Sequence, residues 1–151
     1  MKGWNIHRRC TRKHFTLSNG QHMGIYIMEK KFRVMNDADP NYNFTAWEVG
    51  LCIANTRRQC NDWYERSEKN KRGKMVINRQ TGNCGLEGMR IAYNVVKDLQ
   101  KSVDSNDIIS IRWCNDKRKR AYAYLKRLGF ILTNWDDKPC YYYNRNYMEG
   151  N

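Results

Sequence analysis

The order of hydrophobic patterns in the second half of the chain constrains its fold most strongly. Residues 86–101 carry apolar side chains at helical spacing, namely Leu86, Met89, Ala92/Tyr93, Val96 and Leu99. Residues 107–113 alternate instead, which predicts a strand with Ile109, Ile111 and Trp113 on one face. A short apolar run at 74–78 predicts another strand before the helix. This alternation of strands and helices is typical of an α/β sheet covered by helices.

The C-terminal residues predict a second helix followed by a hairpin. Asp116 is a candidate N-cap, and the apolar stripe of this helix is formed by Ala121, Leu125 and Leu128. Gly129 then fits a left-handed C-cap. The remaining pattern predicts a strand, a turn and a returning strand at residues 130–135, 136–139 and 140–145.

The first half of the chain is less regular. Residues 1–14 predict a basic arm or a short helix, 24–34 one or two strands, and 36–43 a loop. Residues 44–54 fit two interpretations, because alternation favours a strand whereas Thr45 and Glu48 form a possible capping box. The strand is preferred, followed by a polar helix over 55–68 and an exposed turn at 67–74. We therefore predict one α/β (α+β) domain over residues 1–151, with a mixed sheet flanked by helices.

Charge is the main guide to the class of partner. The 28 Lys and Arg residues exceed the 15 Asp and Glu residues, giving a net charge of +13. This excess favours an anionic partner such as nucleic acid, a phosphorylated cofactor or an acidic protein, although a solvated basic face would have the same composition. No apolar stretch is long enough for a membrane span, and no signal peptide is visible. The six cysteines show no zinc-ribbon spacing, so a cytoplasmic protein with reduced thiols is expected.

The segment QTGNCGLEGM, residues 80–89, lies between the predicted strand at 74–78 and the predicted helix. The first amides of a helix lack internal partners and carry partial positive charge, and glycine lets an anion approach them. The amides of Asn83 to Leu86 are thus candidate ligands for a phosphate. A tight turn without any ligand would show the same short pattern.

This segment resembles the Q/R-x-x-G-x-G/A loop of the GNAT superfamily of N-acetyltransferases. In that family the loop follows the fourth strand and binds the pyrophosphate of acetyl-CoA. In the preferred register Asn83 takes the place of the first glycine, and Asn tolerates left-handed backbone conformations well. A second register runs from Arg79 to Cys84 and aligns the helix less well. The resemblance implies a cofactor-binding set of Gln80, Thr81, Gly82, Asn83, Cys84, Gly85, Leu86 and Asn115.

A second match lies in WCNDKRKRAYAYLKRLGF, residues 113–130. The family often has an Asn after its fifth strand, here Asn115, and a helix that ends in Leu-Gly-Phe, here residues 128–130. Together the two matches cover residues 74–145, which the resemblance identifies as the acetyl-CoA-binding half of a mixed, mostly antiparallel GNAT-like sheet. Many family members have a Tyr four residues before this glycine that protonates the CoA thiolate. Leu125 occupies that position here.

Amine acetylation requires an oriented thioester, a base for the ammonium and an acid for the thiolate. Glu48 is the candidate base if residues 47–53 form a central strand, and Tyr124, beside Leu125, is the candidate acid. Each has a simpler interpretation: Glu48 as a capping or solvated carboxylate, and Tyr124 as a packing residue. His7, Cys10 and His14 would share one face of a helix, but no fourth ligand lies nearby, so no metal site is predicted.

The sequence thus leads to two functional hypotheses. The first is an acetyltransferase that moves an acetyl group from acetyl-CoA to a primary amine of a protein or small molecule. The second is an inactive GNAT-like binding protein, such as a phage or mobile-element regulator, whose basic surface binds nucleic acid or an acidic protein. The clusters that motivate the second are residues 1–35, with eight Lys and Arg, and the run at 117–120. Neither hypothesis specifies an oligomeric state.

Overall fold

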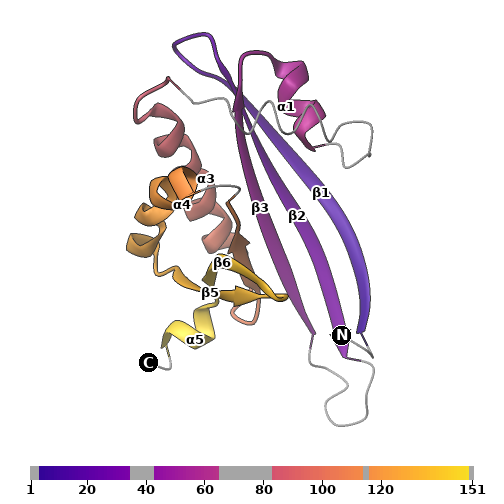
Figure 1. The fold of residues 1–151 in the computed structure, drawn as a ribbon. Coiled ribbons are helices and arrows are strands. Elements are labelled where there is room, and N and C mark those ends of the chain that lie inside the picture. Colours follow the sequence, from indigo (N-terminus) through magenta and orange to yellow (C-terminus); the bar gives the residue numbers. More distant parts are fainter. Residues whose placement is uncertain (1–3, 35–42, 65–82, 114–115, 150–151) are drawn as a thin grey trace. The chain divides into compact units, whose positions relative to one another are not determined.

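The computed structural model describes residues 4–34, 43–64, 83–113 and 116–149. Figure 1 shows the helices and strands that these residues form. The strands are β1 (Trp4–Thr16), β2 (His22–Val34), β3 (Asn43–Ala54), β4 (Ile108–Ile111), β5 (Ile131–Trp135) and β6 (Lys138–Tyr143). The helices are α1 (Arg57–Tyr64), α3 (Glu87–Ser102), α4 (Asp116–Ala121) and α5 (Arg145–Glu149), with a 3-10 helix η2 (Tyr122–Leu128) after α4.

The six strands form one mixed, mostly antiparallel sheet in the order β1-β2-β3-β4-β6-β5. Its one parallel pair in the described ladders is β3 and β4, with Ala46 opposite Ile108 and Val49 opposite Ile111. The pairs β4–β6 and β5–β6 run antiparallel. A parallel pair needs a long crossover connection, and residues 55–107, which include α1 and α3, supply it here.

Packing divides the chain into two compact units. The first unit comprises Met1–Thr11, Ile27–Val49 and Lys97–Asn151, and the second comprises Arg12–Tyr26 and Gly50–Val96. Strands β1 to β3 and helix α3 contribute residues to both units. Each unit has its own cluster of buried side chains.

The first unit is built around the short strand β4. All four β4 residues are buried, as expected for a strand with neighbours on both sides and covered faces. Phe32, Ala46 and Ile108 form a buried cluster, and the rings of Phe44 and Trp135 pack against it. The register beside this cluster is fixed by the buried carboxylate of Asp107, which accepts hydrogen bonds from the Thr45 amide and the Trp47 indole.

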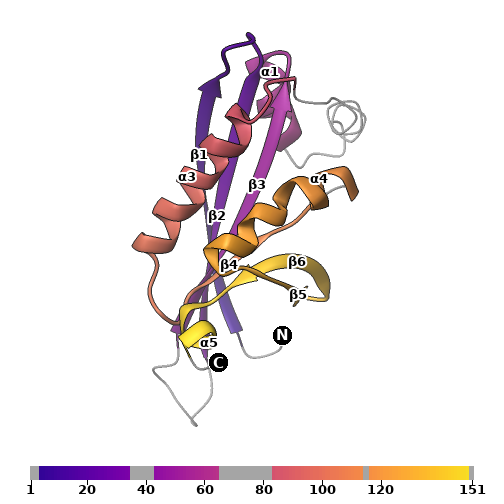
Figure 2. The same cartoon turned by 90° about the vertical axis from the view of Figure 1, so that its left-hand side faces the viewer.

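Two turns in the first unit follow directly from local sequence. Gly129 ends η2 with φ of 83° in the left-handed region, and the Phe130 amide donates to the Leu125 carbonyl, as in a helix C-cap. Figure 2 shows α4 and η2 in succession beside the hairpin of β5 and β6. Asp136 and Asp137 both have positive φ in the two-residue hairpin turn, a geometry that Asp tolerates and that matches the twist of the strands.

The second unit contains the turn between β1 and β2, the end of β3, α1 and the start of α3. Tyr26, Cys52, Ala54 and Cys60 form its buried cluster, and Trp63 packs against them. The Tyr26 hydroxyl donates to the Cys60 carbonyl, which joins β2 to α1. In α3 the buried residues of this unit are Gly88, Ala92, Val95 and Val96. Ala92 and Val96 belong to the apolar stripe predicted from the sequence, whereas Leu86, the first residue of that stripe, is 70% exposed.

Several predicted elements are confirmed and three need correction. The strands at 24–34 and 44–54, the helix at 86–101 and the C-terminal hairpin are present. Residues 4–14 form part of strand β1 and not a helix, because they pair with β2. The strand predicted at 107–113 is shorter and is buried on both faces. The helix predicted from residue 116 becomes a 3-10 helix of seven residues at Tyr122, an unusual length for this kind of helix.

Other predictions lie partly or wholly outside the described residues. These are the loop at 36–43, the end of the polar helix at 55–68, the turn at 67–74, the strand at 74–78 and the residues Gln80, Thr81, Gly82 and Asn115. Strand β4 pairs with β3 on one side and β6 on the other. The short helix α5, Arg145–Glu149, was not predicted.

Candidate functional site

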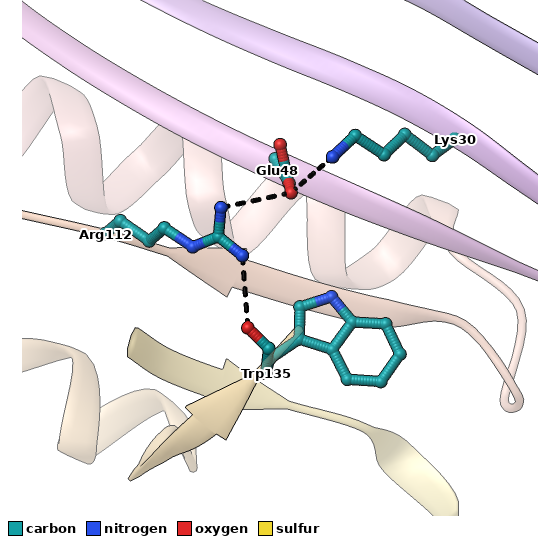
Figure 3. Close-up of polar contacts among 4 residues, drawn as sticks. All are labelled: Lys30, Glu48, Arg112 and Trp135. Carbon is teal, nitrogen blue, oxygen red and sulfur yellow. Dashed lines mark hydrogen bonds and ion pairs between the residues drawn. The ribbon is translucent and has the colours of Figure 1, made fainter. Parts of the chain in front are cut away.

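Glu48 lies on β3, between β2 and β4, so the condition under which it was a candidate base is met. Its Oε1 atom lies 2.6 Å from Lys30 Nζ and 3.5 Å from an Arg112 terminal nitrogen. Figure 3 shows both cations reaching this one oxygen. The side chains of Lys30 and Glu48 are only 13% and 16% exposed. Glu48 is therefore neither a helix cap nor a solvated carboxylate.

Arg112 connects this ion cluster to the C-terminal hairpin. Its Nη2 donates to the Trp135 carbonyl at 3.1 Å, at the end of β5 (Figure 3). The Arg112 Nε and the Ser110 hydroxyl are buried, and neither has a hydrogen-bond partner among the described residues. Ser110 is paired with Glu48 in the β3–β4 register, and paired residues point to the same face of a sheet. The cluster therefore combines a carboxylate, two cations and a buried hydroxyl with spare bonding capacity.

Sequence reasoning found Glu48 but missed Lys30, Ser110 and Arg112. Lys30 falls within a basic segment that was interpreted only by its total charge. Arg112 and Ser110 belong to an alternating strand pattern of which only the apolar positions were interpreted. The available signal was the presence of charged residues inside strands that are otherwise apolar, because such residues are seldom buried unless they are paired.

Tyr124, the candidate acid, lies in η2 and is half-buried. Burial raises the pKa of Tyr124 well above its ordinary value, and the nearby Tyr122 phenol raises it further. The phenol is therefore protonated at neutral pH, but the raised pKa makes it a weaker proton donor than an ordinary tyrosine. Leu125, in the position where many GNAT members have tyrosine, is fully buried in the core of the first unit.

The described part of the predicted phosphate loop belongs to the second unit and begins at Asn83. The Asn83 amide donates to Gln21 Oε1 at 2.9 Å, so a side chain already satisfies this candidate ligand. The amides of Cys84, Gly85 and Leu86 have no acceptor among the described residues. Gly85 has φ of 57°, and a Cβ atom added there would meet nothing within 4 Å. Three consecutive amides and an open left-handed glycine thus precede α3.

A carboxylate also lies at this end of α3. Glu87, in the first turn, accepts hydrogen bonds from the Ser18 amide at 3.1 Å and from the Ser18 hydroxyl at 2.6 Å. The Ser18 hydroxyl, followed by the Ser18 amide and the Arg90 charge, lowers the pKa of Glu87. A negative side chain at a helix N-terminus is itself favourable. It also repels any second anion brought to the same turn.

A basic surface follows the length of α4 and continues into η2. Residues 117–120 are all Lys or Arg, and α4 has no buried residue. The Lys119 ammonium lies 5.4 Å from the centre of the Trp113 ring, a distance at which cation–π attraction acts. The hydroxyl of Tyr141 donates to the Lys119 carbonyl, which attaches α4 to β6. The predicted basic run therefore lies on a solvent-facing helix that is attached to β6.

Comparison with protein-family models, with curated proteins and with solved structures gave no match for this chain. In the described residues, none of the helices combines the length and the apolar character required to span a membrane. The function is therefore argued from the residues and their geometry.

Proposed function

We propose that this chain is a cytoplasmic acetyltransferase of GNAT type that moves an acetyl group from acetyl-CoA to a primary amine. The observation that carries the proposal is the start of α3. There the amides of Cys84, Gly85 and Leu86 are unpaired in the described part of the chain, and Gly85 leaves open space beside them. Such a helix start offers hydrogen-bond donors and partial positive charge to a phosphate group.

The cofactor-binding role extends to Gln80, Thr81, Gly82 and Asn115 through the resemblance alone. The contact between Asn83 and Gln21 changes one detail of the proposal. The Asn83 amide orients the loop instead of binding the cofactor, since it already has an acceptor. The pyrophosphate would then be bound by the three amides that follow.

Glu48 and Tyr124 are the proposed groups for proton transfer. The amine nitrogen attacks the thioester carbon, a C–N bond forms, and the C–S bond breaks to release the CoA thiolate. Glu48 accepts the ammonium proton at Oε2, because Lys30 and Arg112 both contact Oε1. Tyr124, beside the position where many GNAT members have tyrosine, is the proposed proton donor to the thiolate.

Cofactor binding is tested by calorimetry and thermal unfolding with acetyl-CoA. The proposal predicts that the wild-type chain binds and is stabilised, and that Gly85→Glu loses both effects because a carboxylate blocks the amides. Gly20→Glu is the matched control: Gly20 also has positive φ, at 83°, with nothing within 4 Å of an added Cβ. Both variants thus carry a comparable backbone strain and the same new charge. The proposal is rejected if the wild-type chain shows no binding at about millimolar acetyl-CoA. A Kd of about 1 mM corresponds to a binding free energy of only about 4 kcal/mol, so even weak binding would be detected.

The exposed basic helix favours a second candidate function, binding to nucleic acid without catalysis. Lys117, Arg120, Lys126 and Arg127 are all exposed on α4 and η2. Each Lys or Arg that neutralises a phosphate releases counterions, so affinity for DNA would fall steeply with salt. Replacing these four residues with Gln should weaken DNA binding and flatten its salt dependence. Salt-dependent DNA binding combined with no acetyl-CoA binding would favour this function over the first.

A further inference from the structure

The turn between β1 and β2 contacts the residues at the start of α3 at two points. Gln21 Oε1 accepts a hydrogen bond from the Asn83 amide at 2.9 Å. Glu87 accepts hydrogen bonds from the Ser18 amide at 3.1 Å and from the Ser18 hydroxyl at 2.6 Å. All four residues belong to the second unit. The two contacts join positions that are 62 and 69 residues apart in the sequence, so the fold alone brings them together.

The turn is well defined by its own hydrogen bonds. The Leu17 amide donates to the Gln21 carbonyl at 2.8 Å, and the Gln21 amide donates to the Asn19 side chain at 2.9 Å. Beside the turn, the rings of His14 and His22 are joined by a hydrogen bond of 3.1 Å and stack on each other. These bonds tie β1 to β2 where the turn begins and ends, so the turn is a defined support for the side chains that it carries.

Gln21 fixes the backbone in front of α3. Its Oε1 atom accepts from the Asn83 amide and also from Asn19 Nδ2 at 2.9 Å, while its Nε2 donates to Asn55 Oδ1 at 3.2 Å. The side-chain amide is therefore oriented from three directions. The amides that follow Asn83, those of residues 84–86, have no acceptor among the described residues. The contact with Gln21 thus determines where these three donors begin.

Ser18 binds the carboxylate that lies nearest to those donors. Glu87 is in the first turn of α3, where a negative side chain is attracted to the unpaired amides of its own helix. These are the amides that the proposed function assigns to a phosphate group. The Ser18 hydroxyl, followed by the Ser18 amide, lowers the pKa of Glu87, which shows that both donors stabilise the charged form. Ser18 therefore holds a competing anion at the β1–β2 turn.

We propose that Ser18 and Gln21 are positioning residues for the anion-binding amides of residues 84–86. Gln21 acts through Asn83, by fixing the backbone, and Ser18 acts through Glu87, by keeping its carboxylate away from the amides. The inference rests on the proposed function, since that function supplies the phosphate. Gly20 takes part in neither contact, and a Cβ atom added there would meet nothing within 4 Å, so the Gly20→Glu control preserves both.

The role of Ser18 is tested by the affinity for acetyl-CoA in calorimetry. Ser18→Ala loosens the Glu87 carboxylate and should weaken binding roughly threefold, whereas Glu87→Gln removes the competing charge and should strengthen it by a similar factor. The double variant should bind as tightly as Glu87→Gln, because no charge is left to withhold. A merely structural contact would shift both single variants in the same direction, and that result overturns the proposed role.

Asp98→Asn is the matched control for the change in net charge. Asp98 is exposed on the same helix, eleven residues after Glu87, which places it about 16 Å away along the axis. This distance exceeds the screening length of about 8 Å at physiological salt, so the affinity should stay close to that of the wild type. If Glu87→Gln binds acetyl-CoA no more tightly than Asp98→Asn does, the proposal is wrong.

The role of Gln21 is tested without any ligand, by NMR relaxation of the free chain. Gln21→Met keeps the length of the side chain but removes the acceptor, and the backbone order parameters of residues 83–86 should fall from about 0.85 toward about 0.6. Gln21→Glu retains an acceptor for the Asn83 amide and should restore them. Unchanged order parameters in Gln21→Met, with a folded chain by circular dichroism, overturn the positioning role.

The two measurements separate this inference from the proposed function. Acetyl-CoA binding by the wild-type chain, combined with unchanged order parameters in Gln21→Met, rejects the positioning role and leaves the proposed function intact. Lowered order parameters in Gln21→Met, combined with no binding by the wild-type chain, reject the proposed function and support the role of Gln21 in fixing the backbone.

Discussion

Two carboxylates in this molecule, those of Glu48 and Glu87, lie in contrasting surroundings. Glu48, in the first unit, is largely buried and contacts the side-chain charges of Lys30 and Arg112. Glu87, in the second unit, is partly buried at the start of α3 and accepts hydrogen bonds from Ser18 that lie at the surface. A buried charge loses its hydration, so its partners become indispensable, whereas water can replace the partners of an exposed one. We therefore expect stability to depend on Glu48 far more than on Glu87.

The largest expected effect comes from removing the charge at Glu48. Glu48→Gln leaves two cations partly buried without their anion, and breaking such a cluster costs about 3 kcal/mol. Urea unfolding measures this loss. Glu29→Gln is the matched control, because Glu29 is also 16% exposed and pairs with Lys31, whose side chain is 55% exposed. The control should lose less than about 1 kcal/mol. Equal losses in the two variants would remove the distinction between a buried cluster and a surface pair.

An intermediate effect is expected when one of the two cations is removed. Lys30→Met keeps an apolar stem of similar length, and Arg112 still neutralises Glu48, so the cost should be about 1–2 kcal/mol. The double variant Lys30→Met with Glu48→Gln should lose less than the sum of the single changes, because the groups are in direct contact. A strictly additive result in urea unfolding would show that the 2.6 Å contact contributes little coupling.

The smallest effect is expected at Glu87, and it should depend on pH. The pKa of Glu87 is lowered in the folded chain, chiefly by the Ser18 hydroxyl. Its contribution is therefore present above the ordinary carboxyl pKa and is lost as the pH falls through the lowered value. The difference in Tm between wild type and Glu87→Gln should shrink on acidification. Ser18→Ala, which removes the largest cause, should show the same trend. A difference that stays constant with pH would indicate that the contact has no electrostatic part.

The sequence by itself determined the elements whose signals are local. The apolar stripe of α3, the left-handed cap at Gly129 and the β5–β6 hairpin depend on neighbouring residues, so periodicity and turn chemistry were sufficient. The candidate loop at 80–86 was found by the same means, and its role stays a prediction. Candidate acid Tyr124 was placed on its helical segment, and the half-buried position agrees with its simpler interpretation as a packing residue.

Tertiary structure alone decided which distant residues meet. Lys30, Glu48 and Arg112 come from three separate elements, and only the strand order β2-β3-β4 brings them together. His14 gained His22 as a neighbour because residues 4–16 pair as a strand, whereas a helix would have turned it toward Cys10. Local propensity cannot specify such pairings, because a strand gains its stability from partners that lie far away in the chain. The sequence thus determined which charged and polar side chains are present, and the strand order determined which of them lie in contact.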